Sequence, residues 1–167
     1  MGFLAGSLLV GFGSFFVSEV IGNKAKAIYS PSGASTPPNR DYSRAEALAV
    51  RGHYDDAIAV YEVAIAELPS DPDPYVRLAT LLMEKVGDPE RASVWLQRAL
   101  KEGDLRGKWE MVLVRELTDL YVHRMVTPAR AAPLLARVAD RYEGTADGDW
   151  AREELAHVKR LMAADME

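Results

Sequence analysis

The residues of this 167-residue chain that are able to carry chemistry are few and scattered. The candidate metal ligands or proton carriers are three histidines: His53, His123 and His157. None of them stands in a spacing such as H-E-x-x-H, which puts two ligands on one face of a helix. The adjacent carboxylates Asp55-Asp56 and Glu153-Glu154 point to different sides of a helix. The chain has no cysteine, which excludes thiol catalysis, and no phosphate-binding glycine loop. We therefore expect no enzyme activity, no cofactor and no bound metal.

An apolar opening is more informative than these polar residues. Residues 1–22 read MGFLAGSLLVGFGSFFVSEVIG, and the first 18 carry no charged side chain. About 20 such residues in a helix cross the hydrocarbon core of a bilayer. No basic residue precedes the apolar run, as a signal peptide requires, although Ala25-Lys26-Ala27 resembles a cleavage site beyond it. The sequence therefore predicts a single transmembrane helix over 1–22; the alternative is a helix buried in a soluble assembly.

The flanks of this helix indicate its orientation. Lys24, Lys26 and Arg40 all follow it, so the positive-inside bias places the C-terminal part in the cytoplasm, anchored to the inner (cytoplasmic) membrane. Glu19 is expected to be an interfacial carboxylate. A stripe of small residues on the helix is expected to pack against integral membrane subunits: Ser7, Gly11, Ser14, Ser18 and Gly22. The alternative is that these residues have no role, because glycine and serine are common in such helices.

A linker follows over 23–40, and its Pro- and Ser-rich part reads IYSPSGASTPPNR. Residues 41–167 are long enough for one domain with one core. They carry 17 Lys plus Arg against 24 Asp plus Glu, a charge near −7. This balance disfavours nucleic acid and anionic lipid as ligands of the domain, because both reward clustered basic residues.

The 3.6-residue period of apolar side chains predicts an all-α domain. The expected helices cover about 43–50, 54–67, 74–85, 89–101, 108–125, 128–141 and 150–163. Asp41 or Ser43 is expected to cap the first helix, Asp71 or Asp73 the third, and Asp147 or Asp149 the last.

A repeat of 35 residues runs through this domain. Gly52, Ala57 and Ala64 recur as Gly87, Ala92 and Ala99, which predicts stacked helical hairpins. The segment RGHYDDAIAVYEVAIAELP resembles the second half of a tetratricopeptide repeat in its glycine, aromatic, alanine, aromatic, alanine, proline series. The copy VGDPERASVWLQRALKEG is close to it, and TPARAAPLLARVADRY is a degenerate third copy, spaced by 39 residues, with Val126 in the glycine position. The predicted repeat core is Gly52, Ala57, Tyr61, Ala64, Gly87, Ala92, Leu96 and Ala99.

The resemblance implies a short array of hairpins with a capping helix, and a groove formed by the first helix of each hairpin. The residues expected to line it are Tyr42, Glu46, Arg77, Leu81, Glu84, Lys85, Glu116, Leu120, His123 and Arg124. Chaperone-binding members of the family hold a terminal carboxylate with lysines and asparagines. Tyr42 and Glu46 stand at the first of those positions, so that clamp is absent. Trp95, Trp109 and Trp150 are expected to pack in the core rather than stack on a ligand.

Together these features predict a non-catalytic scaffold or accessory subunit of a membrane complex, whose repeat domain braces a protein partner. A photosynthetic, a respiratory and a secretion complex are all compatible hosts. The alternative is a membrane-tethered adaptor or chaperone-like receptor that binds soluble peptides in the groove.

Overall fold

The computed structural model describes residues 42–106 and 108–164, which belong to the second of the two units into which the chain divides, Asp41–Glu167. Within these ranges every regular element is a helix. The helices are α2 (Ser43–Val50), α3 (Tyr54–Glu67), α4 (Asp73–Leu81) continued by η1 (Leu82–Val86), α5 (Pro89–Glu102), α6 (Trp109–Asp119) continued by η2 (Leu120–Arg124), η3 (Pro128–Arg130), α7 (Ala132–Arg141) and α8 (Ala146–Ala164). The prediction of an all-helical domain is confirmed.

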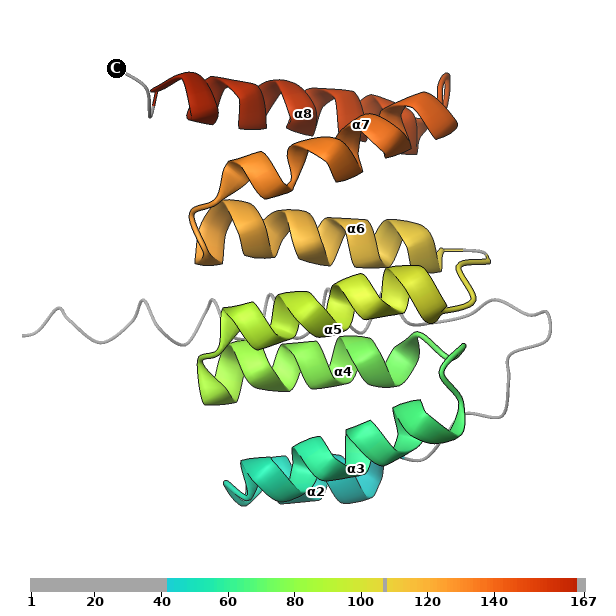
Figure 1. Cartoon of the computed structure of the whole chain (residues 1–167), viewed down its shortest axis with the longest axis vertical. Helices are drawn as coiled ribbons and strands as arrows, with labels where there is room; N and C mark the ends of the chain where they lie inside the picture. The colour runs from blue at the N-terminus through green and yellow to red at the C-terminus, as the bar shows by residue number, and fades with distance from the viewer. Residues whose placement is uncertain (1–41, 107, 165–167) are drawn as a thin grey trace, which may run out of the picture. The chain divides into compact units, whose positions relative to one another are not determined.

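The helices of this unit stack in chain order (Figure 1). Each helix packs against the next, from α2 on α3 to α7 on α8, and η3 also packs against α8. The first helices of the three hairpins are α2, α4–η1 and α6–η2, and the second helices are α3, α5 and α7. The last helix, α8, covers the end of the stack beside α7 (Figure 1). Local contacts of this kind are typical of helical repeat arrays.

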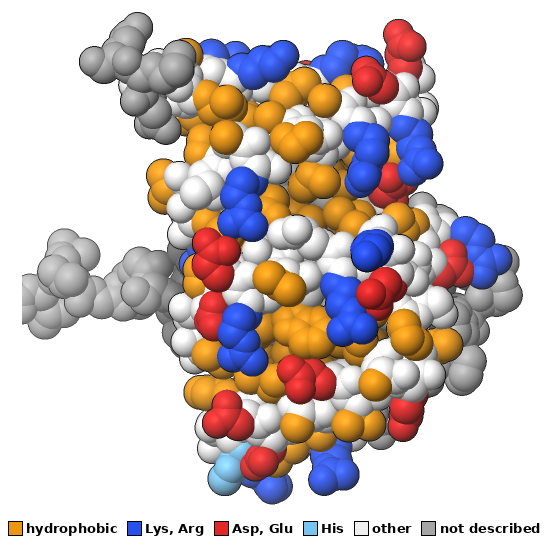
Figure 2. Space-filling model, in the orientation of Figure 1, with side chains coloured by type: hydrophobic (Ala, Val, Ile, Leu, Met, Phe, Trp, Pro, Cys, Tyr) orange, Lys and Arg blue, Asp and Glu red, His pale blue; other side chains and the backbone are white. Residues whose placement is uncertain are grey.

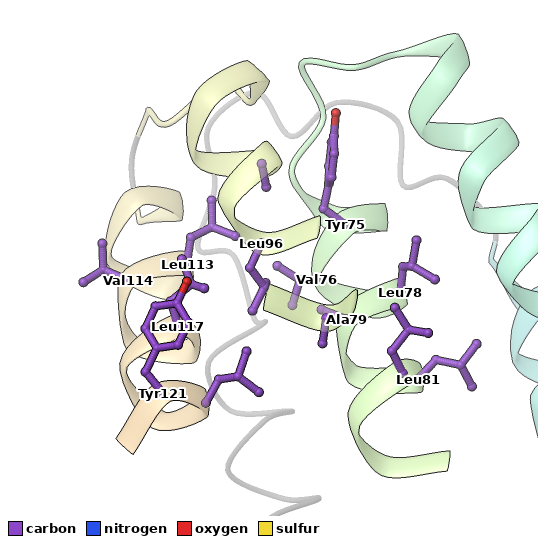
Figure 3. Close-up of a cluster of buried hydrophobic side chains, with 14 of the residues drawn as sticks. Tyr75, Val76, Leu78, Ala79, Leu81, Leu96, Leu113, Val114, Leu117 and Tyr121 are labelled. Carbon is purple, nitrogen blue, oxygen red and sulfur yellow. The ribbon is translucent and has the colours of Figure 1, made fainter. Parts of the chain in front are cut away.

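Small alanines and larger aliphatic residues form the core between the helices. Ala57, Ala92 and Ala99 are fully buried, as is Leu96, while Tyr61 is 4% exposed and Ala64 packs against the cluster. Figure 3 shows Leu96 of α5 between side chains of α4 and those of α6–η2. A buried alanine lets two helix backbones approach closely, and the larger side chains fill the space beside it. The core is therefore continuous from the second hairpin into the third.

The turns inside the hairpins use the left-handed backbone conformation. Gly52 and Gly87 have φ values of 82° and 74°, which glycine adopts without steric cost. Val126 has a φ of 51° and is the non-glycine residue with positive φ in the described part of the chain. It therefore occupies the glycine position that the repeat pattern assigns to it. A β-branched residue in this region is unusual.

The first helices of the second and third hairpins each end in a π-helical turn, η1 and η2. The Gly87 N–H donates to the Leu82 carbonyl, and the Met125 N–H donates to the Leu120 carbonyl at 2.9 Å, each five residues back. Such a turn inserts one residue into the helix and rotates everything before it by about 100°. The predicted helices 74–85 and 108–125 match α4–η1 and α6–η2 to within one residue at each end, but the π turns were not predicted.

The last helix begins four residues earlier than predicted. The Thr145 hydroxyl accepts from the Gly148 N–H at 3.2 Å, so Thr145 caps α8 instead of Asp147 or Asp149. Gly148 is required there, because a Cβ at this position lies 2.1 Å from the Tyr142 carbonyl oxygen. The N-cap of the first helix is Tyr42, whose side chain makes no capping hydrogen bond, and Asp41 lies outside the described residues. At the third helix, Asp71 does accept from the Asp73 N–H at 3.1 Å.

In residues 42–106 and 108–164, no helix is both long enough and apolar enough to cross a bilayer. The transmembrane helix predicted over 1–22, with its small-residue stripe, and the linker over 23–40 lie outside the described residues.

Candidate functional site

The first helices of the three hairpins carry the residues predicted to line a groove, and they meet at two junctions. The first junction, between α2 and α4, is formed by Tyr42, Glu46, Asp73 and Arg77. The second, between η1 and α6–η2, is formed by Glu84, Glu116 and Asp119. The two junctions differ in how their charges are neutralised.

At the first junction a single guanidinium holds the surrounding groups together. Arg77 Nη1 donates to Glu46 Oε1 at 2.6 Å, and Arg77 Nε donates to Asp73 Oδ2 at 3.0 Å. The guanidinium carbon also lies 5.0 Å from the centre of the Tyr42 ring, a cation–π distance. Burial acts to lower the pKa of Arg77, but the carboxylates of Asp73 and Glu46 outweigh it and raise the pKa above its usual value. The charges of this junction are therefore satisfied within the domain.

The second junction brings carboxylates together. Burial raises the pKa of Glu116 above its usual value, and the carboxylates of Asp119 and then Glu84 raise it further. Among the described residues no Lys or Arg forms an ion pair with Glu84 or Glu116, and the basic side chain beside Asp119 is that of His123, whose Nε2 lies 4.0 Å from Asp119 Oδ1. Neighbouring like charges with little water between them destabilise one another. This junction therefore has negative charge available for a partner.

Glu110 is a buried carboxylate of α6 whose charge is neutralised by partners within the domain. The side chain of Glu110 is 4% exposed and accepts two hydrogen bonds from Arg141 Nη1, at 2.8 and 2.9 Å. The Tyr142 hydroxyl donates a third at 2.7 Å, and this bond to Glu110 raises the pKa of Tyr142. Glu110 therefore fixes α6 to the end of α7, whereas Glu116, one and a half turns further along the same helix, has no such partner.

Three of the residues predicted to line the groove lie in the core instead. Tyr42 is 5% exposed with its ring 5.7 Å from that of Tyr61, Leu81 is 6% exposed and Leu120 is fully buried. Figure 3 shows Leu81 beside Leu78 in the cluster of buried side chains. Leu81 and Leu120 each follow a polar groove residue, Arg77 or Glu116, by four residues, but their apolar side chains are buried in the core. The remaining predicted residues with exposed side chains are Glu46, Glu84, Lys85, His123 and Arg124.

Other side chains predicted from the sequence have structural surroundings. The Trp95 ring lies 6.1 Å from Tyr75, and the Trp150 ring lies 3.9 Å from the Arg115 guanidinium carbon. Both tryptophans, together with Trp109, pack against the core. Sequence reasoning missed Asp119 as a groove residue, although its spacing of three residues after Glu116 places it on the same side of the helix.

On the face of the array that includes α5, charged side chains of opposite sign are paired, unlike the carboxylates of the second junction. Figure 2 shows basic and acidic side chains interspersed with apolar ones over one face of the array. Close pairs of opposite charge involve α5: Arg98 and Glu102 of α5 are 2.9 Å apart, and Arg130 of η3 lies 3.2 Å from Glu90 of α5. Exposed pairs of this kind contribute little stability but leave no net charge.

Hairpins of this geometry, with small residues at the helix crossings and glycine in the turns, define the repeat type. Residues 48–113 match the family model described as Tetratricopeptide repeat. The matched segment runs from the end of α2 into α6 and includes the first junction's Arg77 and the second junction's Glu84. The third hairpin and α8 complete a tetratricopeptide-like array beyond the match. Tetratricopeptide repeats are typically non-catalytic and mediate protein–protein interaction. No curated protein matches the chain.

Proposed function

We propose that the protein is a non-catalytic, membrane-anchored scaffold that holds a protein partner with its tetratricopeptide-like domain. The observation that carries the proposal is the array itself, with a family match over residues 48–113 and first helices whose exposed residues are mostly polar or charged. Residues 42–106 and 108–164 contain no group of three or more His, Cys, Asp or Glu placed to hold a metal ion. The arrangement suits recognition of a polypeptide surface.

The membrane part of the proposal rests on the sequence of residues 1–22 and their basic flank. The apolar run anchors the protein in the inner (cytoplasmic) membrane, and its small-residue stripe packs against an integral subunit of a photosynthetic, respiratory or secretion complex. The repeat domain then faces the cytoplasm, because Lys24 and Lys26 follow the apolar run.

A second candidate function is favoured by the second junction. Among the described residues the carboxylates of Glu84 and Glu116 form no ion pair, and that of Asp119 is paired with His123 alone, which suits a tethered adaptor that exchanges soluble peptides. The two functions differ in the lifetime of the complex. A scaffold subunit keeps a stoichiometric partner after mild detergent extraction, whereas an adaptor loses its peptides on dilution.

The experiment purifies the full chain from its native membrane in mild detergent and compares two matched variants. Gly11→Leu adds bulk to the small stripe and is expected to lose the co-purifying complex while the protein stays in alkaline-washed membranes. Phe12→Leu, on the neighbouring bulky side, is the control and is expected to keep the complex. Release of the wild-type protein by the alkaline wash contradicts the anchor. Equal retention of the complex by both variants shows that the helix makes no specific contact.

A further inference from the structure

A small pocket lies where the third hairpin meets the capping helix. It is lined by Val122, His123, Val126, Pro128, His157 and Leu161, and its volume is about 200 Å³. The lining is mainly apolar, with one histidine from η2 and one from α8. Small-molecule sites are commonly about 300–1,000 Å³, so this pocket is nearer in size to one side chain. Interfaces of proteins often place one apolar anchor side chain in a pocket of this kind.

Val126, which lines one side of the pocket, has a strained backbone conformation. Val126 has a φ of 51°, a conformation that strongly disfavours a β-branched residue, and its side chain is 74% exposed. The equivalent turns of the first two hairpins use Gly52 and Gly87, which adopt this conformation freely. A glycine at position 126 removes the strain and also removes the apolar wall. Strained residues of this kind are concentrated at functional sites.

The charge beside the pocket indicates which partner fits. Glu116, Asp119 and His123 follow one another at spacings of three and four residues along α6–η2, so they form one stripe that leads to the pocket. Glu84 of η1 is close enough to raise the pKa of Glu116, and no basic side chain of the described residues offsets this effect. Lys85 and Arg124 are exposed at the ends of η1 and η2, but neither forms an ion pair with these carboxylates. The stripe therefore complements positive charge.

We propose that the pocket and the neighbouring carboxylates bind a basic segment of a protein partner, with one apolar side chain in the pocket and Lys or Arg residues against Glu84, Glu116 and Asp119. This inference rests on the proposed protein-binding function and names the chemistry of the partner. The pocket and the carboxylates have different roles. The pocket holds the apolar anchor side chain of the partner, and the carboxylates select the basic residues that flank this anchor.

The first experiment measures fluorescence anisotropy of labelled synthetic peptides on the purified full chain in non-ionic detergent at low salt. The probe is a dodecapeptide of Gly and Ser with one central Trp and four Lys. Replacing its Trp by Ser is expected to weaken binding at least about tenfold, and replacing its Lys by Glu is expected to abolish binding. Equal binding of the Trp and Ser peptides overturns the anchor, and equal binding of the Lys and Glu peptides overturns the charge preference.

Matched variants of the protein locate the site. Val126→Gly is expected to weaken binding of the probe about tenfold, whereas Val50→Gly, at the exposed end of α2 (88% exposed), leaves it unchanged. Glu116→Gln is expected to weaken binding and reduce its salt dependence, and the exposed Glu153→Gln is the control. Wild-type affinity in both Val126→Gly and Glu116→Gln overturns the proposal. So does a self-association of the chain, measured by sedimentation, that Val126→Gly abolishes.

Failure of this inference is distinguishable from failure of the proposed function. If the native partner co-purifies equally with the wild type and with the Val126→Gly, Glu116→Gln double variant, the domain binds its partner elsewhere, and only the pocket proposal is wrong. If no protein co-purifies with the wild type, the scaffold function is wrong. If, in addition, the Trp and Ser peptides bind equally, the pocket proposal is wrong as well.

Discussion

The two junctions between the first helices are built in equivalent places of the array but treat their charges in opposite ways. At the first junction, Arg77 is bonded to Asp73 of its own helix and to Glu46, so its charge links α4 to α2. At the second, burial raises the pKa of Glu116, and the carboxylates of Asp119 and then Glu84 raise it further. The comparison separates charge that serves the fold from charge that is left for a partner. Substitutions at and around the two junctions test this difference.

The largest effect is expected from a charge placed in the core that both junctions share. Ala92 is fully buried in α5, between α4 and α6, so Ala92→Glu buries an unpaired carboxylate and overpacks the helix crossing. We expect a loss of about 3 kcal/mol or more in the free energy of unfolding, measured by denaturant titration with circular dichroism. Val94→Glu is the control on the same helix, because Val94 is 60% exposed, and a change within about 0.5 kcal/mol is expected. Similar losses in both variants contradict the orientation of α5.

Removing the guanidinium of the first junction is expected to have the next largest effect. Arg77→Met keeps the apolar stem but leaves Glu46 and Asp73 beside the Tyr42 ring without a cation. Because the Glu46 side chain is 56% exposed, water offsets part of the loss, and we expect about 1–2 kcal/mol of destabilisation. Lys85→Met is the control, since Lys85 forms no ion pair with a described residue. Equal stability of the two variants in thermal melts contradicts a stabilising role for Arg77.

How much of this comparison is visible in the sequence depends on which helix is considered. The 35-residue period and the helix-end signals predicted 43–50 and 54–67, which agree with α2 and α3, and identified the glycine position that Val126 occupies. The π turns η1 and η2 were not predictable, because a turn with hydrogen bonds five residues apart has no pattern in a single sequence. Leu81 and Leu120, which were predicted to line the groove, are core residues. The pocket depends on the packing of α8 against η2 and η3, which no local pattern contains.

Gly87 and Val126 hold equivalent positions in the turns that follow η1 and η2, so each residue can be replaced by the other in turn. Val126→Gly removes the backbone strain of a valine with a φ of 51°, which stabilises the folded state. The glycine also gives the unfolded chain more conformational entropy, which opposes folding, so we expect a net stabilisation of at most about 1 kcal/mol. Gly87→Val is the reverse change in the second hairpin, where a Cβ meets no atom within 4 Å. It is expected to cost about 1–2 kcal/mol through the backbone alone. Thermal melts are expected to show a higher melting temperature for Val126→Gly and a lower one for Gly87→Val. A Val126→Gly variant that is less stable than the wild type contradicts the strain at Val126.

The smallest effect is expected at the second junction, and its sign sharpens the contrast with Arg77. The folded-state pKa of Glu116 is raised above 4.5, first by burial and then by Asp119 and Glu84, so the ionised carboxylate destabilises the fold. The favourable protonated form is fully present below the unfolded pKa, and its contribution is lost as the pH rises through the folded pKa. Glu116→Gln mimics the protonated form, so it is expected to raise the melting temperature at pH 7 and to lose this advantage as the pH falls through the raised folded-state pKa toward 4.5. Glu153→Gln, on an exposed part of α8, is expected to change little at either pH. A Glu116→Gln variant that is less stable than the wild type at pH 7 contradicts the repulsion at this junction, and the two junctions are then alike.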